Sequence, residues 1–447
     1  MQVQQWGSDD IYKHPPPQFG HGMHKYFGFD PQYINLNHGS YGATPLPVLA
    51  AVNKIAIEIE SNPDYFHRIQ YQPILIDIRR RLSQMIGASL DECVLVQNAS
   101  MGMNIIMRGL EWEAGDILVP FNTTYRSVSK TVKYISDIKP CPVVAQFVIE
   151  FPTTHEEIVT KFREHLRSLP DNKGKKKVAV IDSIVSNPGS VVDAAHSIGQ
   201  EETNLSESQP DFWVSNCHKW LFTKRSCAVL YVPERQVVCS SIYRKIPINI
   251  IRFRNQNVVK TSIPTSHSYI SPVDRVESNF VIQYEWNGTI DWAPYLSVNA
   301  ALDFRSWLGG EAKINAYCHE MAIKGGKRLA EIFGTRVLDP DGELTLNMVN
   351  VELPFPGNVP FNAKIDLKFK QKMLEEQNTY SAPFYHNGSW WTRCSAQVWT
   401  EVWNIYSVSS GLSDNIAVKV EDFEKIGQAW LTVCAEVLEE IEGKKVS

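Results

Sequence analysis

Short apolar runs alternate with helical stretches from residue 93 to residue 182, and this rhythm limits the possible folds more than any other feature. The runs CVLVQ, DILVP, PVVAQFVI and KVAVIDSIV are rich in β-branched residues. Strands that are buried on both faces have such continuous apolar runs, and helices between them return the chain so that the next strand is parallel. The pattern predicts an α/β fold with a mostly parallel sheet covered on both faces.

The flanking segments have other patterns. Residues 45–60 and 73–86 carry apolar side chains at helical spacing, which predicts two helices before the first strand. After about Pro294, long helices alternate with strands such as LNMVNVEL and SAQVWTEVW, as in an α+β lobe. The length of 447 residues also exceeds the usual size of a single core. We expect an N-terminal segment 1–44 that joins the small domain, a large domain 45–294 and a small C-terminal domain 295–447.

Composition and charge exclude several classes of protein. Hydrophobic residues make up 43% of the chain and charged residues 21%, as in ordinary globular proteins. The net charge of −5, with no basic cluster beyond KGKKK at 173–177, gives no sign of nucleic-acid binding. The eight cysteines lack CxxC spacing, so we expect reduced thiols and no metal site. Because we find neither a secretory signal nor a membrane-spanning apolar run, we expect a cytoplasmic location and no membrane partner.

A lysine lies between two predicted strands, in a segment that is otherwise suited to burial. The segment SNCHKW, residues 215–220, follows the apolar run DFWV and precedes AVLYV. A buried, unpaired ammonium group is costly, and condensation of the Lys219 amine with an aldehyde removes most of that cost. The alternative is a lysine that reaches solvent from a loop.

A second segment, VVDAAHSIGQ at residues 191–200, places a carboxylate where a strand ends. Asp193 follows two β-branched residues and precedes small residues and His196. Ligands of α/β proteins bind at the carboxyl ends of parallel strands. We therefore expect Asp193 to lie at a ligand site.

These two segments and four others resemble motifs of the class V aminotransferases, a branch of fold type I that contains cysteine desulfurases and isopenicillin N epimerase. Within the branch, the sequence is most similar to fungal hercynylcysteine sulfoxide lyases of ergothioneine biosynthesis and to loline-pathway enzymes. The resemblance implies the PLP-dependent transferase fold of type I, with pyridoxal 5'-phosphate (PLP) as cofactor. The motifs occur in family order between Phe27 and about Trp403: INLNHGSYG, QNASMGMN, VVDAAHSIGQ, SNCHKWLFTKRSCAVLYVP, IPTSHS and WNGTID.

The resemblance also assigns residues to the cofactor ring. Lys219 would hold the cofactor as a Schiff base and then serve as the catalytic base. Asp193 would pair with the protonated pyridine nitrogen, which keeps the ring an electron sink. Tyr125 would stack on the ring, although an ordinary packing role is the alternative, and His196 and Ser186 would lie near the phenolic oxygen.

The cofactor phosphate needs donors at a helix N-terminus. The positions that match the family's phosphate site are Ser100, Met101, Asn216 and His218. Thr289 matches a residue that reaches the phosphate of the other subunit, which implies a homodimer with shared active sites.

The substrate-binding residues are also implied by the resemblance. Arg393 would grip the α-carboxylate of an amino-acid substrate, because a guanidinium group matches a carboxylate bidentately. A structural ion pair is the alternative for this arginine. Asn37, His38 and Gly39 would line the substrate side of the site.

The sequence leaves open which reaction follows removal of the α-proton: β-elimination, racemisation or transamination. Desulfurases keep a sulfur-accepting cysteine in the small lobe, but no cysteine occurs between Cys318 and Cys394, which disfavours an enzyme persulfide. A carbon–sulfur lyase that acts on a cysteine sulfoxide conjugate, such as hercynylcysteine sulfoxide, needs no such thiol. This is the reaction we favour, with an epimerase, an aminotransferase or a loline-type enzyme as alternatives.

One segment departs from the family pattern. The family has a helix and a strand after the proline-glycine that follows the ring-contact serine, but here Gly189 is followed almost directly by Val191. Parallel neighbours usually need a crossover of about a dozen residues or more, so we expect this link to be too short. Either a segment is missing from the sequence or the chain is a shortened form. In the second case Asp193 would miss the pyridine nitrogen, and the alternative to an enzyme is a degenerate, non-catalytic dimeric homologue.

Overall fold

A computed structural model describes residues 9–171, 174–182, 190–233, 279–285, 288–402 and 422–443. The chain divides into two compact units. Unit 1 takes in residues 1–11, 44–149 and 155–304, and unit 2 takes in residues 12–43, 150–154 and 305–447.

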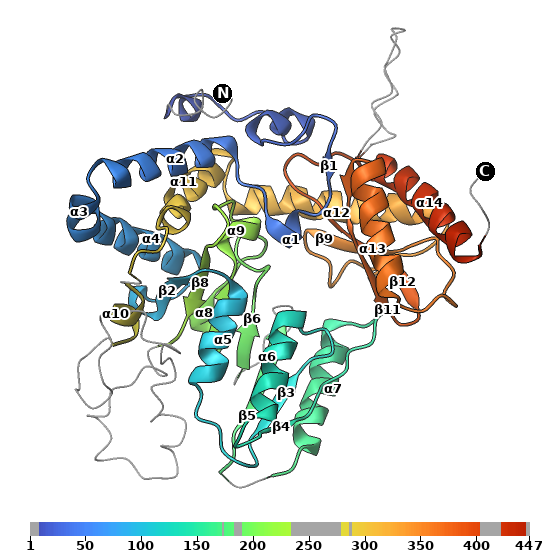
Figure 1. Cartoon of the computed structure of the whole chain (residues 1–447), viewed down its shortest axis with the longest axis horizontal. Coiled ribbons are helices and arrows are strands. Elements are labelled where there is room, and N and C mark those ends of the chain that lie inside the picture. Colours follow the sequence, from blue (N-terminus) through green and yellow to red (C-terminus); the bar gives the residue numbers. More distant parts are fainter. Residues whose placement is uncertain are drawn as a thin grey trace. The chain divides into compact units, whose positions relative to one another are not determined.

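A seven-stranded sheet is the centre of unit 1 (Figure 1). Its strands are β2 (Cys93–Val96), β3 (Ile117–Pro120), β4 (Val143–Val144), β5 (Lys177–Asp182), β6 (Ser190–Asp193), β7 (Phe212–Ser215) and β8 (Ala228–Tyr231). The strand order is β2-β8-β7-β6-β5-β3-β4. Strands β7, β6, β5, β3 and β4 run parallel, whereas β8 is antiparallel to both of its neighbours. The prediction of a mostly parallel sheet is confirmed.

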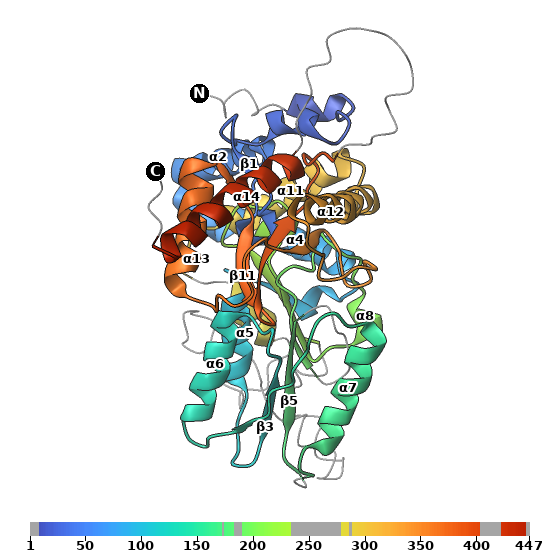
Figure 2. The ribbon, with the colours of Figure 1, turned by 90° about the vertical axis from the view of Figure 1, so that its right-hand side faces the viewer.

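Helices cover both faces of this sheet because successive strand residues point to opposite sides. Val191 and Val214 pack in the cluster that contains residues of α5 (Ala99–Gly109) and α6 (Arg126–Asp137). Val192 and Trp213, one position away in each strand, pack in a second cluster that contains residues of α4 (Tyr71–Met85). Figure 2 shows α5 and α6 on one side of β3 and β5 and α7 (His155–Ser168) on the other.

The remaining helices of unit 1 are shorter or lie before and after the sheet strands in the chain. The two helices that were predicted before the first strand are confirmed as α2 (Leu46–Ser61) and α4. The others are α3 (Pro63–Tyr65), α8 (Leu205–Ser208), α9 (Cys217–Trp220), α10 (Asn279–Glu285) and α11 (Ala293–Trp307, with residues 305–307 in unit 2), with single turns at Phe66–Gln70 and Leu90–Glu92.

The short link before Asp193 does not prevent parallel pairing, so the expectation that it would is wrong. Strands β5 and β6 are parallel neighbours, with Asp182 opposite Asp193 in register. The link itself, residues 183–189, lies outside the described residues. Because β6 has only four residues, the chain must travel back about 13 Å along the sheet before it enters this strand. A link with as many residues as 183–189 can span roughly 23 Å. Asp193 therefore stands at the carboxyl edge of the sheet.

Unit 2 is an α+β unit, as the pattern after Pro294 predicts. An antiparallel sheet has the order β11-β12-β9, and β1 pairs in parallel with β10. These strands are β1 (Ile34–Asn35), β9 (Met348–Glu352), β10 (Thr379–Tyr380), β11 (Ala382–His386) and β12 (Ser389–Ser395). The helices are α1 (His38–Tyr41), α12 (Glu311–Phe333), α13 (Ala363–Gln371) and α14 (Asp422–Ile441), with further turns at Asp9–Lys13 (residues 12–13 in unit 2), His21–Tyr26 and Lys372–Glu376.

The predicted strand SAQVWTEVW is wrong beyond its first residue. Ser395 ends β12, and a turn follows. The Gln397 N–H donates to Thr400 Oγ1 at 3.0 Å, and the Thr400 N–H donates to the Gln397 carbonyl oxygen at 2.8 Å. Because these local bonds satisfy the backbone, the β-propensity of Val398 and Trp399 does not lead to a sheet ladder.

Across the described ranges, we find no helix that combines the length and the apolar character needed to cross a membrane.

We predict that Gly199→Ala destabilises the chain strongly. Gly199 has a φ of 81°, and an added Cβ would lie 2.8 Å from the backbone carbonyl carbon of Trp220. The left-handed backbone and the clash together should lower the free energy of unfolding by about 2–4 kcal/mol. The matched control is Gly334→Ala, because Gly334 has a φ of 64° but nothing within 4 Å of an added Cβ. Equal losses for the two variants in urea unfolding would show that the close approach to Trp220 is unimportant.

Candidate active site

Helix α9 holds Lys219 directly after strand β7. The neighbours Cys217 and Trp220 are buried on the core side, whereas Lys219 is only half-buried. His218 Nδ1 lies 2.8 Å from the carbonyl oxygen of Cys227, which ties the turn to the residue before β8. The Lys219 amine therefore projects from a firmly anchored turn, and its Nζ lies 3.0 Å from His196 Nε2.

Asp193 places a carboxylate at the end of β6, the strand beside β7. Its side chain is 6% exposed, and the Ala195 N–H donates to its Oδ1 at 3.2 Å. Burial raises the pKa of Asp193, while the Ala195 N–H and the charge of Lys219 act in the opposite direction. A buried carboxylate in this position is suited to pair with a cationic ring nitrogen.

The buried Ser215 anchors the turn that carries His196 through two hydrogen bonds. The Ile198 N–H donates to Ser215 Oγ at 3.0 Å, and the Ser215 hydroxyl donates to the Ala194 carbonyl oxygen. The Gln200 amide donates to the His196 carbonyl oxygen at 2.8 Å. These bonds set where the His196 ring can point, so the short distance to Lys219 results from the local fold.

Asp182 is a site residue that the sequence analysis missed. It ends β5 beside Asp193, and its Oδ2 accepts a hydrogen bond from the Thr123 hydroxyl at 2.9 Å. Burial, followed by the charge of Asp193, raises the pKa of Asp182 to about 6, while bonds from Thr123 and the Tyr125 backbone oppose the shift. The available signal was a carboxylate at the end of a second predicted strand, in KVAVIDSIV.

Tyr125 precedes helix α6 and is 63% exposed. Its backbone is bound to Asp182, which ties the loop before α6 to the edge of the sheet. The exposed ring leaves a face that a planar ligand can cover, and its stacking role stays a prediction.

The N-terminus of α5 meets Asn216, as expected if both belong to one phosphate site. The Ala99 N–H donates to Asn216 Oδ1 at 2.8 Å, and the Met101 N–H donates to the capping side chain of Asn98 at 2.8 Å. The amide of Ser100 lies between these two bonded amides. Asn216 is 5% exposed and has its amide NH₂ group as its donor end.

Three expected cofactor residues have less support from the geometry. Burial lowers the pKa of His218, and its Nδ1 contacts a carbonyl oxygen, so the neutral ring presents Nε2 as an acceptor rather than as a phosphate donor. Thr289 is exposed in a bend between α10 and α11. Ser186 and the motif IPTSHS lie outside the described residues.

Within unit 2, Arg393 lies beside the N-terminal loop that was expected to bind the substrate. Its Nη2 donates to Ser40 Oγ at 2.8 Å and to Asn37 Oδ1 at 3.4 Å. The Gly39 N–H donates to Ser395 Oγ at 3.2 Å, and His38 is buried against Trp399. Arg393 and the expected residues 37–39 are thus grouped, and Ser40 joins them, a contact that the sequence did not reveal.

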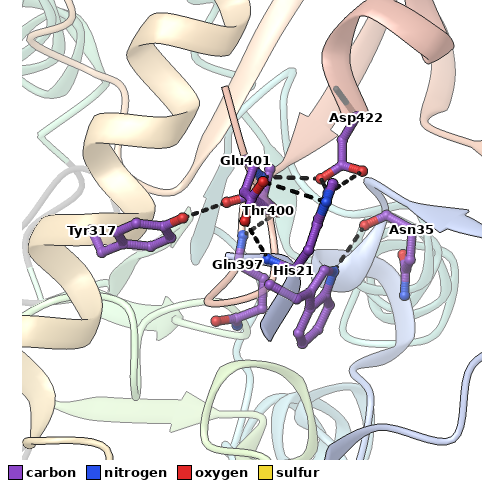
Figure 3. A network of polar contacts seen from close by, with 8 residues as sticks. His21, Asn35, Tyr317, Gln397, Thr400, Glu401 and Asp422 are labelled. Carbon is purple, nitrogen blue, oxygen red and sulfur yellow. Dashed lines mark hydrogen bonds and ion pairs between the residues drawn. The ribbon is translucent and has the colours of Figure 1, made fainter. Parts of the chain in front are cut away.

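A polar network anchors this N-terminal segment within unit 2 (Figure 3). His21 lies between two carboxylates, 3.3 Å from Glu401 and 3.2 Å from Asp422. The Tyr317 hydroxyl donates to the Thr400 carbonyl oxygen at 2.6 Å in the same network. The Ser395 N–H also donates to the Leu36 carbonyl oxygen at 2.6 Å. The bond between Ser395 and Leu36 holds the chain before residues 37–40 against the end of β12, where Arg393 lies, and the contacts of His21 anchor the preceding segment.

Comparison with curated proteins finds relatives that match most of this chain. An L-cysteine desulfhydrase-like protein of Epichloe uncinata is 30% identical, and the match covers 94% of this chain and 97% of the relative. The hercynylcysteine sulfoxide lyase of Schizosaccharomyces pombe is 27% identical over 89% of this chain and 97% of the relative. A probable chloroplastic L-cysteine desulfhydrase of Arabidopsis thaliana is 27% identical over 80% of this chain and 75% of the relative. No protein-family model matches the chain.

Solved structures share the fold. The cystine C–S lyase C-DES, in a mutant with glycine covalently linked to its PLP cofactor, has a TM-score of 0.63 at 15% identity and covers 84% of this chain and 94% of its own. A cysteine desulfurase from Thermococcus onnurineus has a TM-score of 0.60 at 14% identity and covers 96% of this chain and 100% of its own. The predicted fold class, the PLP-dependent transferase fold of type I, is confirmed.

We predict that Asp182 makes the stability of the cofactor-free protein depend on pH. Because its folded pKa is raised to about 6, the stabilisation from its proton is complete below about pH 4 and is lost as pH rises through about 6. From pH 4.5 to 7.5, Asp182→Asn should therefore gain about 1–3 kcal/mol relative to the unchanged chain in urea unfolding. The control is Asp64→Asn, whose carboxyl is 85% exposed. The assignment fails if the two variants respond alike to pH.

Proposed function

Because the chain belongs to the family of the L-cysteine desulfhydrase-like proteins, within the class V aminotransferases, we propose that it is a PLP-dependent carbon–sulfur lyase. Its favoured substrate class is a cysteine sulfoxide conjugate such as hercynylcysteine sulfoxide. The observation that carries the proposal is the amine of Lys219, 3.0 Å from His196 and electrostatically coupled to the buried carboxylate of Asp193. A nucleophilic amine and a buried counter-charge at one sheet edge are the two groups that a pyridine aldehyde cofactor needs.

The residues present fit this cofactor. Asp193 is 6% exposed with a raised pKa, so a cationic partner would stabilise its charged form. In our proposal, Asp193 holds a proton on the pyridine nitrogen, and the α5 N-terminus with Asn216 holds the phosphate. When bound, PLP supplies an electron sink that weakens the bonds at the substrate α-carbon.

Lys219 is the proposed base. Its Nζ would remove the α-proton of the substrate once the amine is released from the cofactor. His196, 3.0 Å away, orients the amine through its Nε2. Arg393 would bind the substrate α-carboxylate, because a guanidinium fork can add charge-assisted bonds to the neutral ones that it makes with Ser40 and Asn37.

The thiols of unit 2 support elimination over sulfur transfer to the enzyme. Cys318 and Cys394 are fully buried, and burial raises the pKa of each to about 12. Burial likewise raises the pKa of Cys434. In the described part of unit 2, these cysteines are therefore held as thiols rather than as nucleophilic thiolates.

The proposed reaction is therefore a β-elimination. Loss of the α-proton and cleavage of the Cβ–S bond release a sulfenate from a sulfoxide substrate, together with 2-aminoacrylate. Water hydrolyses 2-aminoacrylate to pyruvate and ammonia. Free cysteine is the second candidate substrate, because relatives are named L-cysteine desulfhydrase, and it would release hydrogen sulfide with the same two products.

We also propose a homodimer with shared active sites and a cytoplasmic location. The exposed position of Thr289 is consistent with contact to a second subunit, and the family resemblance supports the shared site. Equilibrium sedimentation of the full chain tests the dimer.

The proposed function is tested by pyruvate release from hercynylcysteine sulfoxide, S-alkyl cysteine sulfoxides and cysteine, each with and without added PLP. We expect PLP-dependent pyruvate and ammonia in equal amounts, with the sulfoxides turned over faster than cysteine. Inversion at the α-carbon without pyruvate would support an epimerase instead, and formation of a keto acid that keeps the sulfur would support an aminotransferase. No reaction despite bound PLP would support a non-catalytic homologue.

We predict that Arg393→Lys impairs substrate binding. A lysine cannot form the bidentate pair with a carboxylate, so kcat/KM for the accepted substrate should fall about 10- to 100-fold, mainly through a higher KM. Arg336→Lys is the matched control, because Arg336 binds Glu352 on the surface of unit 2. A loss in Arg393→Lys no larger than in the control would remove Arg393 from the substrate site.

A further inference from the structure

Two consecutive polar contacts connect the core of unit 1 to the amine of Lys219. The indole Nε1 of Trp220 donates to His196 Nδ1 at 3.2 Å. On the other side of the ring, His196 Nε2 lies 3.0 Å from Lys219 Nζ. Trp220 is 1% exposed, and Gly199 packs against its backbone, so the indole is held in place by the core.

The chemistry of the indole fixes where the protons of this chain lie. An indole N–H can only donate, so Nδ1 of His196 must accept. A neutral imidazole carries one proton, which must then lie on Nε2. A doubly protonated ring would place an N–H against the indole N–H, so this contact disfavours the imidazolium form.

The Nε2–H of His196 therefore points toward Lys219. A lysine ammonium group has three donors and no acceptor, so it cannot accept this bond. A neutral amine has a lone pair that can accept it. We propose that Trp220, acting through His196, holds Lys219 as the neutral amine that the proposed function requires. Trp220 is thus a positioning residue whose effect passes through the imidazole.

Other charged groups around Lys219 act in both directions. Asp193, at the end of β6, attracts the ammonium form, and in the cofactor-free chain it opposes the effect of His196. Burial lowers the pKa of His218, beside Lys219 on α9. Its bond to Cys227 acts in the opposite direction, and the charge of Arg225 and any positive charge on Lys219 lower it further. A cationic ring nitrogen that pairs with Asp193 would reduce the attraction of Asp193 for the ammonium form of Lys219. The hydrogen bond from His196 would then have the larger effect on the protonation of Lys219.

The proposal predicts a change in the reactivity of Lys219 that needs no cofactor. The full chain is stripped of PLP and labelled with trace acetic anhydride from pH 6 to 10, and acetylation of Lys219 is measured by mass spectrometry. The free amine attacks the carbonyl carbon, acetate leaves, and the amine proton is lost, so the rate follows the neutral fraction. In Trp220→Phe, the midpoint of the profile should rise by about one pH unit, with about 5- to 10-fold less labelling at pH 7.5.

The matched control is Trp213→Phe. Trp213 lies on β7 and is 3% exposed, in the cluster that contains residues of α4. The Trp213→Phe substitution therefore removes a similar apolar area from the core. Its profile should equal that of the unchanged chain, and the thermal unfolding of both variants shows whether the fold is kept. A Trp220→Phe profile equal to that of the unchanged chain would overturn the proposal.

Two variants of His196 test whether the effect passes through the ring, and they serve if Trp220→Phe does not fold. In His196→Gln, the side-chain oxygen can accept from the indole while its N–H donates to the amine, so labelling should stay near that of the unchanged chain. His196→Ala should reproduce the shift, and Trp220→Phe should add nothing in that background. Equal profiles for His196→Ala and the unchanged chain, or an additive effect of Trp220→Phe, would contradict the proposal.

The inference deepens the proposed function, but the two can fail separately. PLP uptake is followed on the same preparations by its visible absorbance. A shifted labelling profile without PLP uptake would retain the Trp220–His196–Lys219 chain and remove the proposed function. Normal PLP uptake with unshifted labelling profiles would retain the proposed function and remove the role of the Trp220–His196–Lys219 chain.

Discussion

The parallel pairing of β5, β6 and β7 is the constraint on which the candidate active site depends. It brings three strand ends to one edge of the sheet, so Asp182, Asp193 and the turn that carries Lys219 become neighbours. The alternation of side chains along these strands buries both faces in apolar clusters, which fixes the register. A register shift of one residue would point the Asp193 side chain into an apolar cluster, and the site would not form.

Burial of the two carboxyls at this edge of the sheet changes how readily they are protonated. The carboxyls of Asp182 and Asp193 both have raised pKa values because burial disfavours their charged forms. The structure therefore holds two acidic groups whose protonation responds to a bound cation. On the other side, the core-anchored indole of Trp220 orders the protons of His196 toward Lys219.

Periodic patterns in the sequence were sufficient to predict the parallel sheet and the α+β character of unit 2. The family resemblance assigned both Asn37 and Arg393 to the substrate side of the site, without predicting the contact between them. The sequence could not reveal Ser40 or Trp220 as site residues, since their roles arise from contacts between strands or turns. For Asp182, the strand-end position in KVAVIDSIV was an available signal. Two expectations failed for local reasons. The residues after Ser395 satisfy their amides in a turn, and β6, which has only four residues, pairs in parallel with β5.

The most direct test of the account is where PLP attaches. The purified full chain, loaded with PLP, is reduced with borohydride, digested and analysed by mass spectrometry. We expect a visible band that reduction removes and a pyridoxyl adduct on Lys219. A chain that stays colourless and unmodified with PLP supplied, or that carries the adduct on another lysine, would contradict it.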